Sequence, residues 1–135
     1  MRSKLIQFLE ALNKDLNGTL LRTNIPEYVD KIIMYATLET ISEHGRIKAF
    51  IAFYENDEDK ELAYLTMIAV HKDHWQLGYG KKLLESSINQ IKNKGFKRYR
   101  LQVKKDNLKA IKLYEDYGFV RVGEALGLID MEKQL

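Results

Sequence analysis

Hydrophobic positions recur at two different spacings along the chain, and the changes between them predict its elements. Residues 62–70 are apolar on both faces of a strand, which is typical of a central position in a sheet. After a polar turn, Leu84, Ile88 and Ile91 recur at helical spacing. Residues 98–103 then alternate between apolar and polar side chains, which predicts a second strand.

The segment after this second strand predicts another helix and another strand. Asp106 is the expected N-cap of a helix over residues 107–117. Gly118 stands where such a helix ends in a left-handed C-cap, and residues 119–122 resume as a strand. From residue 62 onward the expected order is therefore strand, helix, strand, helix, strand.

The first part of the chain predicts two helices. A helical stripe follows Ser3 and comprises Leu5, Phe8, Leu9, Leu12 and Leu16. Asn24, with Pro26 in the first turn and Glu27 three residues on, begins a second helix through about Ala36. Its expected apolar face comprises Val29, Ile32, Ile33 and Ala36.

The remaining segments predict strands. Residues 37–42 and 47–54 form an expected hairpin around a polar turn that contains Gly45, and residues 128–134 form an expected last strand. Between the two helices, only residues 19–22 can form a short strand.

Composition narrows the class of protein. The 135 residues, 45% hydrophobic and 30% charged, fit one ordinary globular domain. We expect a cytoplasmic protein that does not interact with membranes, because no apolar run approaches a membrane span and the amino terminus lacks a signal-peptide core. The net charge of +3 comes from basic residues interleaved with acids, so we expect no nucleic-acid partner.

The turn between the strand at residues 62–70 and the helix that follows it is a candidate ligand-binding site. Gly78-Tyr79-Gly80 stands where a strand meets a helix, so a ligand can approach the backbone closely, and the helix start favours a phosphate. A plain structural turn is the alternative. A Rossmann fingerprint fails, because position 83 is Leu and no acidic residue follows a second strand. A nucleotide-binding P-loop fails as well, since no Gly-Lys-Ser/Thr follows.

Two motifs resemble those of the GNAT superfamily of N-acetyltransferases. One resembles its pyrophosphate loop, Trp75-Gln76-Leu77-Gly78-Tyr79-Gly80. The other resembles its second acyl-CoA motif, Val103-x-x-x-Asn107-x-x-Ala110-x-x-Leu113-Tyr114-x-x-x-Gly118-Phe119. The resemblance covers residues 47–119 and extends to the rest by element order. It implies one GNAT-like α/β domain over residues 1–135, with a mixed, mostly antiparallel central sheet flanked by helices.

The resemblance also implies a binding site for the cosubstrate acetyl-CoA. Backbone groups of Ile68, Ala69 and Val70 would pair with the pantetheine arm beside a break in the sheet. The pyrophosphate would lie on the N–H groups of residues 77–81, with Gln76 and the Lys81 side chain nearby. These groups belong to Leu77, Gly78, Tyr79, Gly80 and Lys81. Asn107 would hydrogen-bond the pantetheine, and Ala110 would leave room for it.

The implied reaction is acetyl transfer to a primary amine of a small metabolite, such as an amino sugar, or of a peptide. Tyr114 matches the family's tyrosine near the sulfur and would protonate the departing thiolate. An acyl-cysteine intermediate is excluded, since the chain has no cysteine. Direct attack by the amine in a ternary complex is therefore expected, with a backbone N–H near residue 68 or 69 polarising the thioester carbonyl.

Two departures from the family pattern leave questions open. Trp75 occupies the loop position that is usually Gln or Arg, with Gln76 one place later, and Leu77 also departs from the pattern. These changes bear on the affinity for coenzyme A. Tyr64 stands where some members place a catalytic glutamate. The base that takes the amine proton therefore remains open between a water relay and four side chains, namely Tyr64, Glu39, Glu55 and Glu61.

Plainer interpretations compete with each assignment. Tyr114 also fits a core aromatic, and Asn107 a simple helix-start residue. His71 and His74 fit solvated loop residues, and we expect no metal site. Aromatic side chains of the middle segment, namely Tyr28, Phe53, Tyr54 and Tyr64, are candidate walls of the acceptor site. A module that binds coenzyme A without turnover, a Rossmann-like protein and a nucleic-acid binder are the alternative functions. We expect a monomer or a homodimer.

Overall fold

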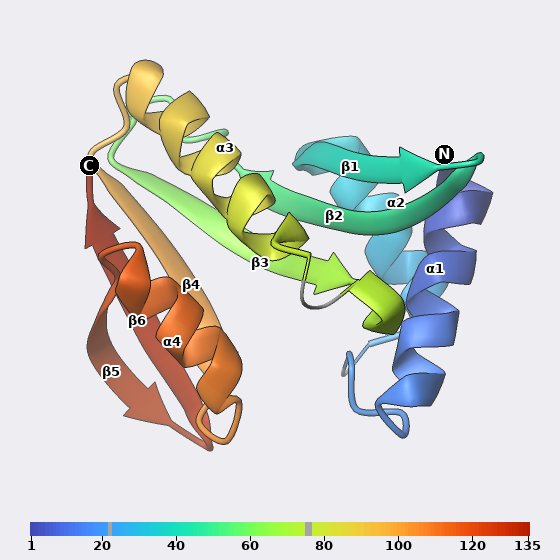
Figure 1. The fold of residues 1–135 in the computed structure, drawn as a ribbon. Coiled ribbons are helices and arrows are strands. Elements are labelled where there is room, and N and C mark those ends of the chain that lie inside the picture. Colours follow the sequence, from blue (N-terminus) through green and yellow to red (C-terminus); the bar gives the residue numbers. More distant parts are fainter. Residues whose placement is uncertain (22, 75–76) are drawn as a thin grey trace.

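The computed structural model describes residues 1–21, 23–74 and 77–135. Figure 1 shows a curved sheet of six strands with helices on both faces. The strand order is β1-β2-β3-β4-β6-β5, and every neighbouring pair is antiparallel except β3 and β4, which are parallel. This is the mixed, mostly antiparallel α/β sheet that the sequence predicts.

Helices α1 (Arg2–Asp15) and α2 (Ile25–Tyr35) pack together against one face of the sheet. The Asn24 side chain accepts a hydrogen bond from the Glu27 N–H at 3.1 Å, which confirms the predicted N-cap. Ile33 was expected on the apolar face but is 41% exposed. The expected short strand is wrong for residues 19–21, which form no strand, and Arg22 lies outside the described residues.

Strands β1 (Thr37–Glu43) and β2 (Arg46–Tyr54) form the predicted hairpin. His44 and Gly45 both have positive φ angles, 52° and 74°, as in the tight turns that suit the twist of two paired strands. Strand β3 (Leu62–Val70) pairs with β2 over residues 64–70 and is central in the sheet, as its apolar sequence predicts.

The C-terminal half follows the predicted order. Helix α3 (Tyr79–Asn93) leads to β4 (Arg98–Lys104), α4 (Leu108–Asp116), β5 (Val120–Ala125) and β6 (Leu128–Gln134), after a short turn of 3-10 helix η1 (Lys72–His74).

The cap of α4 differs from the prediction by one residue. Asn107, rather than Asp106, caps the helix, because its side chain accepts from the Ala110 N–H at 3.2 Å. Gly118 has the predicted left-handed backbone, with φ at 91°.

Two apolar cores lie on opposite faces of the sheet. The core under α3 and α4 includes Tyr99, Leu101 and Phe119 and takes side chains from strands β2, β3, β4 and β6. The core under α1 and α2 takes side chains from β2 and β3 and none from β4, β5 or β6 among the described residues. On that side β4, β6 and β5 therefore present a face that neither helix covers, as Figure 1 shows. No helix in the described ranges has the length and apolar character needed to cross a membrane.

Candidate active site

The pairing between strands β3 and β4 ends about halfway along β3. Their parallel pairing joins residues 62–65 to residues 98–101 and ends at Leu65 and Leu101. β3 continues to Val70 and β4 to Lys104, so the backbones of the two strands diverge beyond these residues, as Figure 1 shows, and we call this gap between the two backbones the opening. This is the break that the resemblance places beside the pantetheine arm.

An extra residue in β3 explains why the strands separate. Ala52 pairs with Met67 and Phe53 with Leu65, so Thr66 has no opposite residue in β2. Such a bulge twists a strand and reverses the direction of the following side chains. Leu65 belongs to the α3 core, and after the bulge Ala69 belongs to the α1 core, whereas Ile68 and Val70 pack against the α3 core.

The start of α3 lies beside this opening. Gly78 is its N-cap, with φ at 76° in the left-handed region, and no side chain of the described residues caps the helix. By helix geometry the N–H groups of residues 79–81 have no partner within the helix. The Leu77 N–H donates to the His74 carbonyl at 3.1 Å, so it is already engaged. Gln76, together with Trp75, lies outside the described residues.

Gly80 joins three elements at the inner end of the opening. A methyl group added to it would lie 3.9 Å from a Val70 side-chain carbon, 4.0 Å from Ile68 and 3.9 Å from Leu113 of α4. These are ordinary contacts, so glycine is not sterically required here. The contacts place the first turn of α3 next to the end of β3 and the side of α4 that carries Tyr114.

The Tyr79 side chain turns away from the opening. Its hydroxyl donates to Glu43 at the end of β1, at 2.8 Å, and its ring stacks on His74 at a centroid distance of 5.7 Å. Only the backbone of Tyr79 therefore remains for a phosphate. Nδ1 of His74 is buried without a hydrogen-bond partner among the described residues. Lys81 is exposed, with no ion pair in the part of the chain that is described.

Helix α4 contributes Asn107, Ala110 and Tyr114. Because the Asn107 oxygen caps the helix, its orientation is fixed and its amide nitrogen remains as a donor. Tyr114 is partly buried, with its ring 5.9 Å from that of Phe119, and its hydroxyl has no hydrogen-bond partner in the described ranges. Burial raises the pKa of Tyr114 to about 12, so the hydroxyl keeps its proton at neutral pH.

The structure places the three candidate glutamates away from the opening. Glu55 and Glu61 lie at the other end of β3, near the turn that enters it. Glu55 accepts from Thr37, Gln90 and Lys94, and Glu61 pairs with Lys97 at 2.9 Å.

Glu39 lies on β1, two strands from the opening, and accepts from Ser86 at 2.8 Å. Of the four side chains considered as the base, Tyr64 alone adjoins the opening. Burial raises its pKa, and the nearby Asp130 adds to the shift, so Tyr64 is a poor base.

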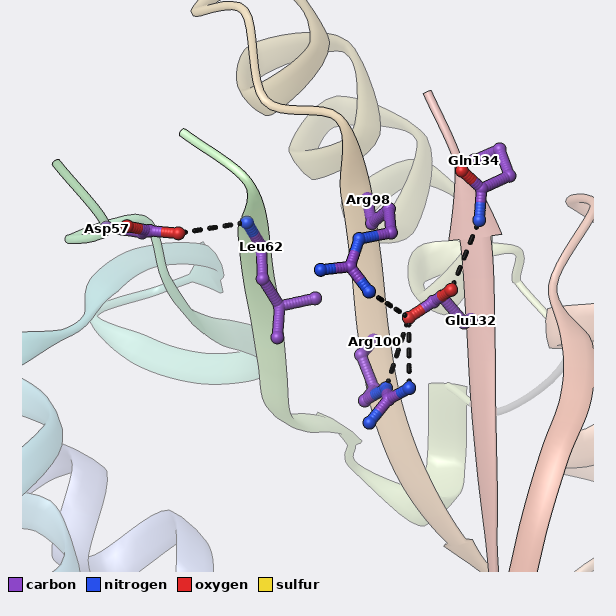
Figure 2. A network of polar contacts seen from close by, with 6 residues as sticks. All are labelled: Asp57, Leu62, Arg98, Arg100, Glu132 and Gln134. Carbon is purple, nitrogen blue, oxygen red and sulfur yellow. Dashed lines mark hydrogen bonds and ion pairs between the residues drawn. The ribbon is translucent and has the colours of Figure 1, made fainter. Parts of the chain in front are cut away.

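Tyr64 begins a row of polar side chains on the open face of the sheet. It lies opposite Arg100, which lies opposite Glu132. Figure 2 shows Glu132 between Arg98, Arg100 and Gln134, with nitrogen–oxygen distances of 3.1–3.2 Å. The same figure shows the carboxylate of Asp57 accepting from the Leu62 N–H, which fixes the start of β3.

Two clefts lie outside this opening. One of about 480 Å³ lies between α1 and the β1–β2 turn, and its rim carries Lys4, Arg46 and Lys48. Another of about 270 Å³ lies beside the turn before α4. Neither includes a predicted site residue among its lining side chains. Among the described residues no three His, Asp or Glu side chains gather as a metal site would require.

Comparison with known proteins decides the family. The sequence model of the Acetyltransferase (GNAT) family matches residues 7–119. The chain belongs to the GNAT family. It is 36% identical over 80 residues to the [ribosomal protein bS18]-alanine N-acetyltransferase of Escherichia coli K12, a match covering 58% of this chain. The chain spans about half of that relative's length, 51%.

Solved structures agree on the fold of this GNAT protein. A GNAT acetyltransferase of Staphylococcus aureus Mu50 superposes with a TM-score of 0.82 at 20% identity, over 99% of this chain and 92% of that one. The PaiA N-acetyltransferase of Thermoplasma acidophilum, solved in complex with coenzyme A, gives 0.79 at 18% identity, with the same coverage of 99% and 92%. These identities support the shared fold and no finer statement.

Sequence reasoning missed three features of the site. The bulge at Thr66 depends on pairing with β2, and Glu132 meets its arginines only through pairing of β4 with β6. Asp130 was not singled out, because only the same register places it across β4 from the opening. The alternating arginines at 98 and 100 were the one available signal, since they predict a polar face on β4.

Proposed function

We propose that this GNAT protein transfers the acetyl group of acetyl-CoA to a primary amine by direct attack in a ternary complex. The observation that carries the proposal is the opening between β3 and β4, which has the uncapped start of α3 at one end and α4 beside it. A long, thin ligand with a phosphate group fits such a site, because the helix start favours the anion and the strand backbone can pair with amides.

Each part of acetyl-CoA then has a partner. The N–H groups of residues 79–81 hold the pyrophosphate, and Lys81 adds a positive charge. Gly78 and Gly80 keep side chains away from it, while the backbone of residues 68–70 pairs with the pantetheine. The amide nitrogen of Asn107 donates to the same arm, and Ala110 leaves space for it. The charge of the pyrophosphate does not change during the reaction, so these contacts contribute to binding.

Tyr114 acts on the sulfur. The amine attacks the thioester carbonyl carbon, the C–S bond breaks, and the sulfur leaves with the electron pair. Since a thiol has a pKa of about 8.5 and that of Tyr114 is about 12, complete proton transfer to the thiolate is unfavourable. Tyr114 therefore stabilises the thiolate as a hydrogen-bond donor while the amine loses its proton to water. This refines the expectation that it protonates the sulfur.

We further propose that the acceptor is the α-amine of a peptide chain, in preference to an amino sugar. The E. coli relative is named for acetylating an alanine of a ribosomal protein. An α-amine has a pKa of about 7.7–8.0, against about 10.4 for lysine, so much of it is already neutral near pH 7.5. The three candidate glutamates all lie away from the opening, which suits such an amine, because it needs no strong base.

Calorimetric titration with acetyl-CoA, with NAD and ATP as controls, tests the first part. Saturable one-site binding of acetyl-CoA alone is expected.

Release of thiol is then measured with a hexapeptide that begins with alanine, with the same peptide carrying an acetylated amino terminus, and with glucosamine. Turnover of the free peptide alone supports the α-amine, and turnover of glucosamine alone contradicts it. Binding of acetyl-CoA without any product would indicate a module without turnover. Cytoplasmic location and oligomeric state stay predictions.

A further inference from the structure

We propose that Asp130 is the anionic part of an ammonium-binding site on the open face of the sheet, where the protonated acceptor amine docks. The proposal rests on the proposed function, since it concerns the acceptor of the same reaction. Asp130 belongs to β6, two strands from β3, and no sequence motif marks it.

Strand register places Asp130 across β4 from the opening. Leu101 is the last β4 residue that pairs with β3, and Gln102, the next residue, pairs with Asp130. Ile129 and Met131 belong to the α3 core, so Asp130 lies on the opposite, open face. Tyr114 belongs to the α4 side. A thioester in the opening would thus have Tyr114 on one side of the sheet and Asp130 on the other, so that the amine and the donor to the sulfur come from different sides.

The charge of Asp130 is not neutralised within the protein. The other carboxylate of this face, Glu132, is held by Arg98 and Arg100. Asp130 makes no hydrogen bond or ion pair with any described residue, although its charge reaches the Tyr64 hydroxyl. Lys104, on the same face of β4, donates to the Thr19 carbonyl at 2.6 Å. The nearby cations are therefore engaged with other groups, and a cation from outside is the partner that Asp130 lacks.

The neighbouring strand leaves room for that cation. Gly123 of β5 pairs with Asp130, and a methyl group there would lie 3.4 Å from its Oδ2 atom. A side chain would thus cover the carboxylate that glycine leaves open. The other side chains of β5 on this face are Val120 and Ala125, which carry no charge. A primary ammonium, with three donors on a small head, matches this uncovered carboxylate, whose charge reaches the Tyr64 hydroxyl.

A carboxylate that pairs with the ammonium stabilises the ground state. Asp130 therefore acts as a positioning residue that lowers the KM for the amine, with a smaller effect on kcat. The site takes the protonated form, which exceeds the neutral form of most amines at neutral pH. The bound ammonium then loses its proton to water, and the neutral nitrogen attacks the thioester.

The experiment compares charged ligands with neutral counterparts of the same shape. The alanine hexapeptide is paired with its analogue that lacks the amino group, and glucosamine with glucose. Each is titrated into the protein with and without coenzyme A, by calorimetry or chemical-shift changes. We expect the protein to bind at least one charged member about tenfold or more tightly than its neutral counterpart, the range of a hydrogen bond to a charged group. We expect Asp130→Asn to remove this preference.

Glu124→Gln is the matched control, because Glu124 lies on the same hairpin, exposed on the opposite face, and its change removes one negative charge. Retention of the preference in Asp130→Asn, or its absence in the unchanged protein for both pairs, overturns the proposal. Thiol release in the same samples separates it from the proposed function. A preference for the charged ligand without thiol release supports the ammonium site and contradicts the proposed acetyl transfer. Thiol release without that preference supports the transfer and contradicts the ammonium site.

Discussion

The hydroxyl groups of Tyr28 in α2 and Thr66 in β3 lie 3.0 Å apart, at the bulge where β3 leaves β4. This bond connects the helix layer to the residue that opens the sheet. Burial raises the pKa of Tyr28 to about 12, so its hydroxyl stays neutral and can donate or accept. The opening is therefore supported by a side-chain contact between segments 38 residues apart.

Breaking this bond should destabilise the fold and distort the opening. We expect Tyr28→Phe and Thr66→Val each to lower the free energy of unfolding by about 1 kcal/mol, the usual net value of one hydrogen bond. The double variant should lose little more than either single variant, because both remove the same bond. Urea denaturation of the unchanged protein, the two single variants and the double variant measures these free energies of unfolding. Additive losses would contradict a direct interaction between the two hydroxyls.

Tyr114→Phe should lower kcat about a hundredfold, the scale of one donor to a developing anion, while the dissociation constant of coenzyme A changes little. The reason is that the hydroxyl contacts charge that exists only as the C–S bond breaks. Tyr117→Phe is the control, since this residue follows α4 with its hydroxyl 3.5 Å from Glu85 at the surface. Steady-state kinetics and calorimetry give both numbers. An equal effect of the two changes would remove Tyr114 from the mechanism.

Gly78 gives a test of the phosphate site that separates charge from shape. Its φ of 76° strains any side chain, so Gly78→Asn and Gly78→Asp share that strain and nearly the same volume. We expect Gly78→Asn to weaken binding of acetyl-CoA and Gly78→Asp to abolish it, because its carboxylate faces the pyrophosphate. Calorimetric titration compares them. Equal affinities of the two variants would place the pyrophosphate elsewhere.

Local features of the fold were predictable, and features made by long-range pairing were not. The Asn24 cap followed from Pro26 and Glu27, which lie within the same turn. Asp106 and Asn107 are adjacent and both can cap a helix, so the choice depends on the backbone, where the Asn107 N–H donates to Lys104. The break in the sheet followed from the family resemblance, whereas its cause at Thr66 required the register of two strands.

Glu55 should make stability depend on acidity. Burial alone would raise its pKa, but hydrogen bonds from Lys94, Thr37 and Gln90 and the charge of Lys94 hold it below the ordinary 4.5. A carboxyl whose pKa is lower when folded stabilises the protein fully above the unfolded value, and this stabilisation is lost as the pH falls through the folded value.

We therefore expect Glu55→Gln to lower stability at pH 7 and to flatten its decrease below about pH 4.5, the unperturbed range of a glutamate. Glu58→Gln, at an exposed position of the next turn, is the control and should leave the curve unchanged. Urea midpoints between pH 3 and pH 7 measure the difference. Parallel curves for Glu55→Gln and the unchanged protein would mean that Lys94 does not pair with Glu55 in solution. If stability falls while turnover near neutral pH is kept, Glu55 is a structural residue and not the base.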